Sequence, residues 1–419
     1  MAFAWWSASA VAQTPIGERD PVYIGELRFS QAEEALYLER HRKAARRSEA
    51  QDLYEPLEAI RGAQPWKPLP IAQLTKRTIS QETLEAASGY AARNNSSALI
   101  IWRNGQIELE SYFGNTTAST ALNSFSLAKP ITAIAVGRAI QLGKIRSLDQ
   151  RVVDFIEEWK GDPRREKILV RHLLDMRGGL LRQADAAAPE EIMARSFLHP
   201  RSDEILIREY PVVDEPGTRY EYNNAASDLA AVLIERATGR RYAEFVGTEI
   251  FEKLGAQGGQ VWVNRVGGVA HGGCCMLLPA ETVLRVAILM ISDGVWNGQR
   301  LLPDRFVREM TQGTAENPYF GLGVFVAGRY TERRGTANPD LPAKKTLHSE
   351  PYLAADLYLF DGNMNQVVYV VPSQGLVILR TGKAPPRSKE QEWDNAYLPN
   401  IVIRGIVKDR RESQPQIRD

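Results

Sequence analysis

The strongest constraint in this sequence is a helix that must be buried, because residues 130–140 are apolar on almost every side. Such a helix packs inside a large protein and not on its surface. Ser126 and Lys129 stand where this run begins, and their spacing places both on one helical face. Burial disfavours a charged ammonium, so Lys129 is expected to have a lowered pKa and to accept the proton of Ser126. The plainer alternative is a serine that caps the helix beside a surface lysine.

A second polar motif follows further along the chain. Pro216 and Gly217 form a turn signal, and Tyr222 and Asn224 come after it in a Tyr-x-Asn pattern. Ser-x-x-Lys combined with Tyr-x-Asn resembles the serine hydrolases related to class C β-lactamases and penicillin-binding proteins. The same family includes esterases and amide hydrolases of the 6-aminohexanoate-dimer-hydrolase-like branch. Residues 143–153 and 168–180 are similar to further segments of that family, and the resemblance covers about residues 80 to 385.

The third motif of the family departs from its usual pattern here. Penicillin-binding members carry Lys-Thr-Gly or His-x-Gly on an edge strand, whereas residues 345–347 read Lys-Thr-Leu and residues 380–382 end a later strand. Residues 362–366 and the apolar strand after them are similar to the Gly-x-x-Gly-Gln segment of ester- and amide-cleaving members, with Asn365 in place of a glycine. Because this segment offers no lysine or histidine to a carboxylate, the resemblance favours esters or linear amides over β-lactams. Arg380 or Lys345 could still take that role from a neighbouring strand or loop.

Turn and strand signals place a β-sheet at the two ends of the domain. Residues 98–102 and 106–113 flank an Asn-Gly pair and predict a hairpin, and further strands are predicted at 356–360, 366–371 and 376–380. Helices are predicted between these ends, at 224–237, 242–254 and 280–293. The predicted fold class is α+β, an α/β sandwich of the β-lactamase/transpeptidase type. Its antiparallel sheet is flanked by helices, and a mostly helical region is inserted between the two halves of the sheet. The active site is expected in the cleft between the two parts.

The resemblance implies a role for each polar side chain of the first two motifs. Ser126 is the expected nucleophile, and Lys129 removes its proton either directly or by a relay through Tyr222. Tyr222 then protonates the leaving amine or alkoxide. Asn224 is expected to hydrogen-bond the lysine or the substrate amide.

A tetrahedral intermediate also needs two preorganised donors for its oxyanion. The backbone N–H groups of Ser126 and Asn363 are expected to supply them. Gly362 is expected to belong to the same substrate-binding segment, where a missing side chain lets another backbone approach.

Two other functions stay open from the sequence. One is a true β-lactamase or D,D-peptidase, and the other is a non-catalytic member of the same fold that only holds a ligand. Covalent labelling by a fluorophosphonate, lost when Ser126 is replaced, separates enzymes from such a binding protein.

Composition limits the partners and cofactors. The chain has 419 residues with 44% apolar content and a net charge of +1, so it can bury a large core and has no excess charge for nucleic acid. A small-molecule ester or amide is the expected partner, while the oligomeric state is left open. No cofactor and no metal are expected, since the histidines show no ligand spacing. Cys274 and Cys275 are expected to be buried without bridging each other, because a bridge between neighbours is strained.

Both ends of the chain are expected to lie outside the hydrolase domain. Residues 1–12 resemble the remnant of an export signal, which predicts a periplasmic or secreted protein, with a cytoplasmic one as the alternative. Residues 13–80 are expected to form an N-terminal extension and linker, in which 31–47 is a charged helix with a solvated face. The domain is expected at 81–385 and a C-terminal tail at 386–419. No run of residues is long and apolar enough to predict a membrane span.

Overall fold

The computed structural model describes residues 25–46, 53–183, 187–335, 345–388 and 391–407. The predicted signal remnant at 1–12 and the end of the predicted tail lie outside these ranges. The main helices are α1 (Gln31–Arg46), α2 (Gln81–Arg93), α3 (Ala128–Gln141), α4 (Val170–Leu174), α5 (Ile192–Leu198), α7 (Asn224–Thr238), α8 (Tyr242–Val246), α9 (Ala280–Ile291), α10 (Phe306–Met310) and α11 (Tyr397–Arg404). None of the helices in the described ranges is long and apolar enough to cross a bilayer.

The largest sheet has six strands in the order β3-β2-β14-β13-β12-β9, and every neighbouring pair is antiparallel. Its strands are β2 (Ser96–Arg103), β3 (Gln106–Tyr112), β9 (Phe325–Val326), β12 (Tyr358–Gly362), β13 (Gln366–Val371) and β14 (Leu376–Gly382). β2 and β14 lie side by side although they come from opposite ends of the domain. The predicted sheet built from both chain ends is therefore confirmed, and so is the Asn-Gly hairpin between β2 and β3.

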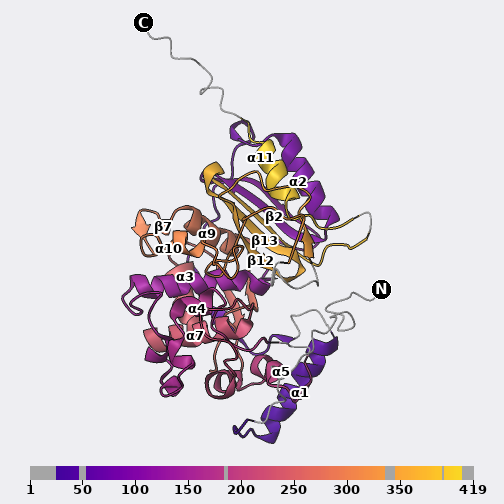
Figure 1. The fold of residues 1–419 in the computed structure, drawn as a ribbon. Helices are drawn as coiled ribbons and strands as arrows, with labels where there is room; N and C mark the ends of the chain where they lie inside the picture. The colour runs from indigo at the N-terminus through magenta and orange to yellow at the C-terminus, as the bar shows by residue number, and fades with distance from the viewer. Residues whose placement is uncertain (1–24, 47–52, 184–186, 336–344, 389–390, 408–419) are drawn as a thin grey trace.

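Helices cover both faces of this sheet. α2 packs on β2 and is itself covered by α11, whereas α9 contacts β2, β13 and β14. Figure 1 shows the sheet with α2 and α11 beside it, and a separate helical part that contains α4 and α7. α3 runs along the boundary between the two parts and packs against α7 (Figure 1). The predicted sandwich with an inserted helical region is confirmed.

A second sheet of four strands supports the helical part. Its order is β1-β5-β6-β4, with β1 (Leu57–Ile60), β4 (Leu122–Asn123), β5 (Gly259–Trp262) and β6 (Met276–Leu278). β1 belongs to the predicted N-terminal extension and pairs with β5. β4 leads directly into the turn that carries Ser126, so this sheet fixes where the buried helix α3 begins.

Three local predictions differ from the structure. The helix predicted at 242–254 ends as α8 at Val246 and continues as a single π-helical turn, Gly247–Phe251. Gly247 begins this turn and lies against the backbone of Arg61, where an added Cβ would be 2.8 Å from the Arg61 nitrogen. The helix at 31–47 is not simply solvated, because Arg40 of α1 is 3% exposed and donates to carbonyl oxygens of three other segments.

The third difference concerns the adjacent cysteines. Cys274 and Cys275 form a disulfide with each other, so the expectation of two unbridged thiols was wrong. Cys275 has a φ of 68°, in the left-handed region of the backbone. Both residues are buried, as expected.

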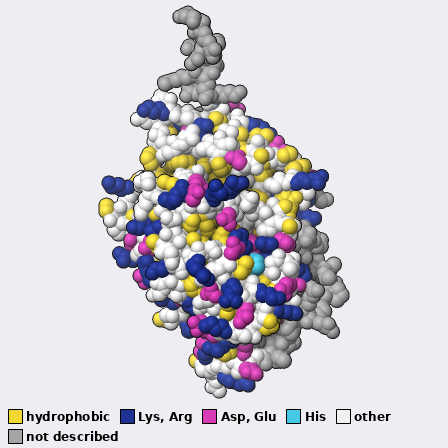
Figure 2. All heavy atoms as spheres, turned by 60° about the vertical axis from the view of Figure 1, so that its left-hand side comes forward, with side chains coloured by type: hydrophobic (Ala, Val, Ile, Leu, Met, Phe, Trp, Pro, Cys, Tyr) yellow, Lys and Arg dark blue, Asp and Glu magenta, His cyan; other side chains and the backbone are white. Residues whose placement is uncertain are grey.

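The surface carries both signs of charge. Figure 2 shows lysine and arginine side chains interspersed with aspartate and glutamate over one face of the molecule. This mixture matches the net charge of +1 and shows no single-sign field on that face for a charged polymer.

Candidate active site

Ser126 and Lys129 meet where β4 turns into α3. A short 3₁₀ turn, Phe125–Leu127, continues directly into α3, and it places the two side chains on one face. The Lys129 Nζ lies 3.1 Å from the Ser126 Oγ. Ser126 is partly exposed, whereas Lys129 is only 3% exposed. The hydroxyl is therefore accessible from solvent while the amine sits in the core, which contradicts the alternative of a surface lysine.

Two further oxygen atoms hold the amine of Lys129. Asn224, the first residue of α7, presents its Oδ1 at 2.6 Å, and the carbonyl oxygen of Gly273 lies at 2.7 Å. Asn223 caps α7 by accepting from the N–H of Ala225, and this cap fixes the direction in which the Asn224 side chain leaves the helix. Lys129 thus connects α3, α7 and the loop before β6.

Burial changes the protonation of this lysine. Loss of hydration lowers the pKa of Lys129 from 10.5 to about 7, and the negative charge of Asp228 partly opposes this shift. The oxygens of Asn224 and Gly273 can only accept hydrogen bonds, so they use two N–H groups of the amine. In the neutral form the remaining position is a lone pair, which faces the Ser126 hydroxyl. This is the arrangement that a general base requires.

Tyr222 lies over the same group. Its ring centroid is 4.5 Å from the Lys129 Nζ, close enough for a cation–π contact with the ammonium. Burial raises the pKa of Tyr222 far above its usual range; a hydrogen bond with Ser126 opposes the rise, and the charge of Asp361 adds to it. Tyr222 therefore stays a neutral phenol at ordinary pH and is a proton donor, not a base.

The sequence did not reveal the support behind Lys129. Asp228 lies one turn after Asn224 on α7, where it contacts the His271 Nδ1 at 3.0 Å and accepts from the Gly273 N–H at 3.4 Å. This carboxylate fixes the 271–273 loop whose carbonyl accepts from Lys129. Gly273 has to be a glycine, because an added Cβ would lie 2.9 Å from the Cβ of Ser227. Asn224 and Asp228 lie four residues apart on one helical face, and this spacing was the signal in the sequence that could have indicated the support behind Lys129.

The end of β12 lies beside Ser126. A Cβ added to Gly362 would stand 3.1 Å from the Ser124 carbonyl oxygen and 3.2 Å from the Ser126 nitrogen. Asn363 follows Gly362 and is exposed. The residue before Ser126, Phe125, has a φ of 45°, an uncommon conformation for a bulky side chain and one often seen at functional sites.

The two cationic side chains that might have replaced the family's lysine do not fill that role. Arg380 is fully buried and donates to the carbonyl oxygens of Met364 and Asn365 at 2.9 and 3.0 Å, among other acceptors. It therefore holds the 362–366 segment in place and is not free to turn to a substrate. Lys345 is exposed on β11 (Lys345–Leu347), a strand of a separate two-stranded ribbon.

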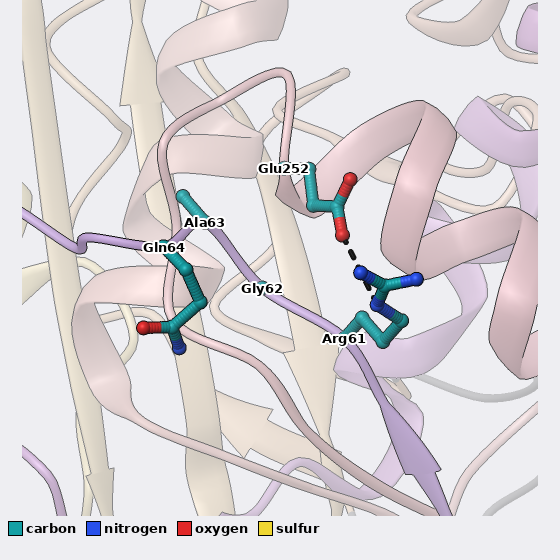
Figure 3. A pocket seen from close by; sticks show the side chains of 5 residues that line it. All are labelled: Arg61, Gly62, Ala63, Gln64 and Glu252. Atoms are coloured by element: carbon teal, nitrogen blue, oxygen red, sulfur yellow. Dashed lines mark ion pairs between the residues drawn. The ribbon is translucent and has the colours of Figure 1, made fainter.

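A pocket elsewhere in the molecule is distinct from this cleft. It has a volume of about 500 Å³ and is lined by Arg61, Gly62, Ala63, Gln64 and Glu252, none of which belongs to the site above. Figure 3 shows its two charged side chains turned toward each other, with the Arg61 Nε 3.3 Å from the Glu252 Oε1. Its charges are paired, and the pocket contains no nucleophile.

The structure thus brings the predicted side chains of Ser126, Lys129, Tyr222 and Asn224 into mutual contact around one amine. It places Gly362 against the backbone of Ser124 and Ser126. The roles of Asp228, His271 and Gly273 were not foreseen.

Known proteins resemble this chain over most of its length. The model of the family described as Beta-lactamase matches residues 83–398. A 6-aminohexanoate-dimer hydrolase of Paenarthrobacter ureafaciens is 25% identical over 250 residues, which cover 56% of this chain and 63% of that relative, less than two thirds of its length. The solved structure of a candidate 6-aminohexanoate-dimer hydrolase of Bacillus anthracis aligns with a TM-score of 0.65 at 18% identity, over 87% of this chain and 94% of that one. EstCE1, a hydrolase with promiscuous acyltransferase activity, aligns with a TM-score of 0.58 at 17% identity, over 78% of this chain and 97% of that one. At these identities the solved structures show a shared fold.

Proposed function

Because the chain belongs to the Beta-lactamase family of hydrolases, we propose that it cleaves an ester or a linear amide through an acyl-enzyme on Ser126. The observation that carries this proposal is the 3.1 Å contact between the Lys129 Nζ and the Ser126 Oγ, in a site where the other partners of the amine are acceptors. A neutral amine so placed has its lone pair directed at the hydroxyl proton.

In the acylation step Lys129 takes the proton of Ser126, and the Oγ forms a bond to the carbonyl carbon of the substrate. The N–H groups of Ser126 and Asn363 hold the resulting oxyanion. The bond to the leaving group then breaks, and Tyr222 donates its proton to the leaving oxygen or nitrogen. The proton held by Lys129 restores the phenol, so the acyl-enzyme starts with a neutral lysine again.

Deacylation repeats the same transfers with water. Lys129 accepts a proton from a water molecule that attacks the ester carbon, and the collapse of the second intermediate returns the proton to Ser126. The acid product leaves and the site is regenerated. The cycle consumes one water and needs no group other than these side chains and backbone donors.

The substrate class follows from what the cleft offers. Arg380 is held by backbone carbonyls and Lys345 is on a separate ribbon, so neither supports the binding of a β-lactam carboxylate. The name of the curated relative, a 6-aminohexanoate-dimer hydrolase, supports a linear amide. We place short-chain esters and linear amides before β-lactams for these two reasons.

The direct test is covalent labelling with a fluorophosphonate. Wild-type protein should be labelled, and Ser126→Ala should not. Ser124→Ala, which changes the serine two residues earlier, should still react. Labelling that survives in Ser126→Ala would place the nucleophile on another residue, and a wild-type protein that is not labelled at all would leave the site as a binding site.

The location of the protein is a further part of the proposal. Residues 1–12 favour a periplasmic or secreted enzyme, and a disulfide between Cys274 and Cys275 is compatible with an oxidising compartment. Fractionation of cells that express the full chain tests this, and a protein found entirely in the cytoplasmic fraction would refute it.

A further inference from the structure

β12 ends on a carboxyl group that the proposed reaction does not use. Asp361 directly precedes Gly362 and is partly exposed. A Cβ added to Gly362 would stand 3.2 Å from the Ser126 nitrogen, so the neighbouring Asp361 lies close to the proposed reacting groups. Within the ranges that the structure describes, nothing donates a hydrogen bond to this carboxyl and no cation pairs with it. A carboxyl beside a nucleophile and without protein partners is available to a ligand.

The surroundings of Asp361 are polar and only partly satisfied. Two buried nitrogen atoms, Arg334 Nε and His348 Nε2, have no hydrogen-bond partner among the described residues, whereas Tyr352 has the Asn395 side chain as a partner. The rings of His348 and Tyr352 lie 5.4 Å apart, and the charges of Arg334 and Asp361 both act on Tyr352. Buried polar atoms usually find a partner. Asp394 accepts from Ser349 and from the Ala396 N–H, so Asp361 is the carboxylate of this cluster that has no protein partner among the described residues.

The charges around the cluster favour a cation. Asp361 and Asp394 carry the negative charges, and Arg334 is the positive group that faces them. Arg334 is engaged elsewhere, since it donates to the Ala327 carbonyl at 2.8 Å and lies over the Tyr319 ring at 4.7 Å. Burial and the charge of Arg334 lower the pKa of His348 to about 4, so this side chain adds no positive charge at neutral pH.

We propose that Asp361 binds a protonated amine of the substrate, carried within a few bonds of the scissile carbonyl. The distance follows from the strand, because a rise of about 3.3 Å per residue separates Asp361 from the Asn363 N–H by roughly 7 Å. An ammonium that contacts the carboxylate then lies close to the carbonyl bound by that N–H. This inference rests on the proposed function and specifies its substrates as amino-acyl esters or amides.

Burial raises the pKa of Asp361 to about 7, with Arg334 opposing the rise. A bound ammonium would lower the pKa again, because an opposite charge within contact distance favours the carboxylate. Binding of the substrate ammonium would thus shift Asp361 to its charged carboxylate form. An uncharged acyl chain would not lower the pKa of Asp361 and would form no ion pair with it.

The test compares two p-nitroanilides that differ at one position. The β-alanine anilide carries an ammonium where the butyric acid anilide carries a methyl group. Wild-type enzyme should prefer the β-alanine anilide by at least about 10-fold in kcat/KM, and Asp361→Asn should reduce this preference to near parity. The ratio is the proper readout because any effect of Asp361 on Tyr222 is common to both substrates.

Asp356→Asn is the matched control. Asp356 precedes β12 and bonds the Ser373 N–H and hydroxyl, away from the cluster, so this variant should keep the wild-type preference. Asp361→Ser is a second variant with the same expected loss if the asparagine does not fold. An equal preference in wild type and Asp361→Asn would overturn the inference, as would a wild-type preference for the butyric acid anilide or for the glutaric acid monoanilide, which carries a carboxylate.

The outcomes also separate this inference from the proposed function. An enzyme whose hydrolysis of p-nitrophenyl butyrate depends on Ser126, but whose preference between the anilides ignores Asp361, keeps the proposed function and refutes the ammonium site. Ester hydrolysis that persists in Ser126→Ala refutes the proposed function instead.

Discussion

The pH dependence of turnover gives a quantitative test of the buried lysine. Lys129 has a pKa of about 7 in place of 10.5, so its surroundings disfavour the ammonium by about 5 kcal/mol relative to the amine. The neutral fraction is then about 1% at pH 5, one half at pH 7 and nearly complete at pH 9. If only the neutral amine accepts the proton of Ser126, kcat/KM rises about 100-fold from pH 5 and reaches a plateau above about pH 8.

The assay is kcat/KM for p-nitrophenyl butyrate between pH 5 and about 10, with the rate of Ser126→Ala subtracted at every pH to remove spontaneous hydrolysis. Tyr222 does not set this limb, because burial keeps its phenol protonated over the whole range. A rate that still rises at pH 10 would show a solvated lysine. A flat profile would show that Lys129 carries no proton in the rate-limiting step.

The sign of the electrostatic effect can be tested on the same profile. Asp228 raises the pKa of Lys129, so Asp228→Asn should move the rising limb to lower pH while the asparagine oxygen can still accept from the Gly273 N–H. Glu350→Gln, a change in a surface ion pair with Arg404, should leave the limb in place. A shift of the Asp228→Asn limb to higher pH would contradict the assigned cause.

Three other changes test the remaining groups. Tyr222→Phe should lower kcat by about 10²-fold with little change in KM, because the leaving group loses its proton donor; an unchanged kcat in steady-state ester hydrolysis would exclude that role. Gly362→Ala should lower kcat/KM by about 10- to 100-fold with thermal stability nearly kept, since the new Cβ would stand 3.2 Å from the Ser126 nitrogen and displace the oxyanion donors; a fully active variant would argue that the donors lie elsewhere. Nitrocefin should be cleaved with a kcat/KM at least about 100-fold below that of p-nitrophenyl butyrate, and comparable values would reveal a carboxylate anchor in the cleft.

Local spacing explains why much of the site could be predicted. Ser126 and Lys129 share one helical face whatever surrounds them, and the apolar run after them predicts that the face is buried. The hairpin at 96–112 and the helix α7 also carry their own signals, an Asn-Gly turn and a glycine at the end, Gly239, with a φ of 68°.

The rest depends on contacts between distant segments. The third partner of Lys129 is the carbonyl of Gly273, and a backbone carbonyl leaves no mark in the sequence. Arg380 looked like a possible substrate ligand, but only the sheet register shows that its guanidinium lies under the 362–366 segment. The bridge between Cys274 and Cys275 occurs where Cys275 has a left-handed backbone conformation, which composition does not encode.

The central claim is that the acyl group passes through the oxygen of Ser126. Rapid quenching of the enzyme with p-nitrophenyl butyrate, followed by peptide mass spectrometry, measures this directly. The account predicts a butyryl adduct on the peptide that contains Ser126, no adduct in Ser126→Ala, and less than about a tenth of the wild-type hydrolysis in that variant. An adduct on another residue, or hydrolysis that survives in Ser126→Ala, would contradict the account.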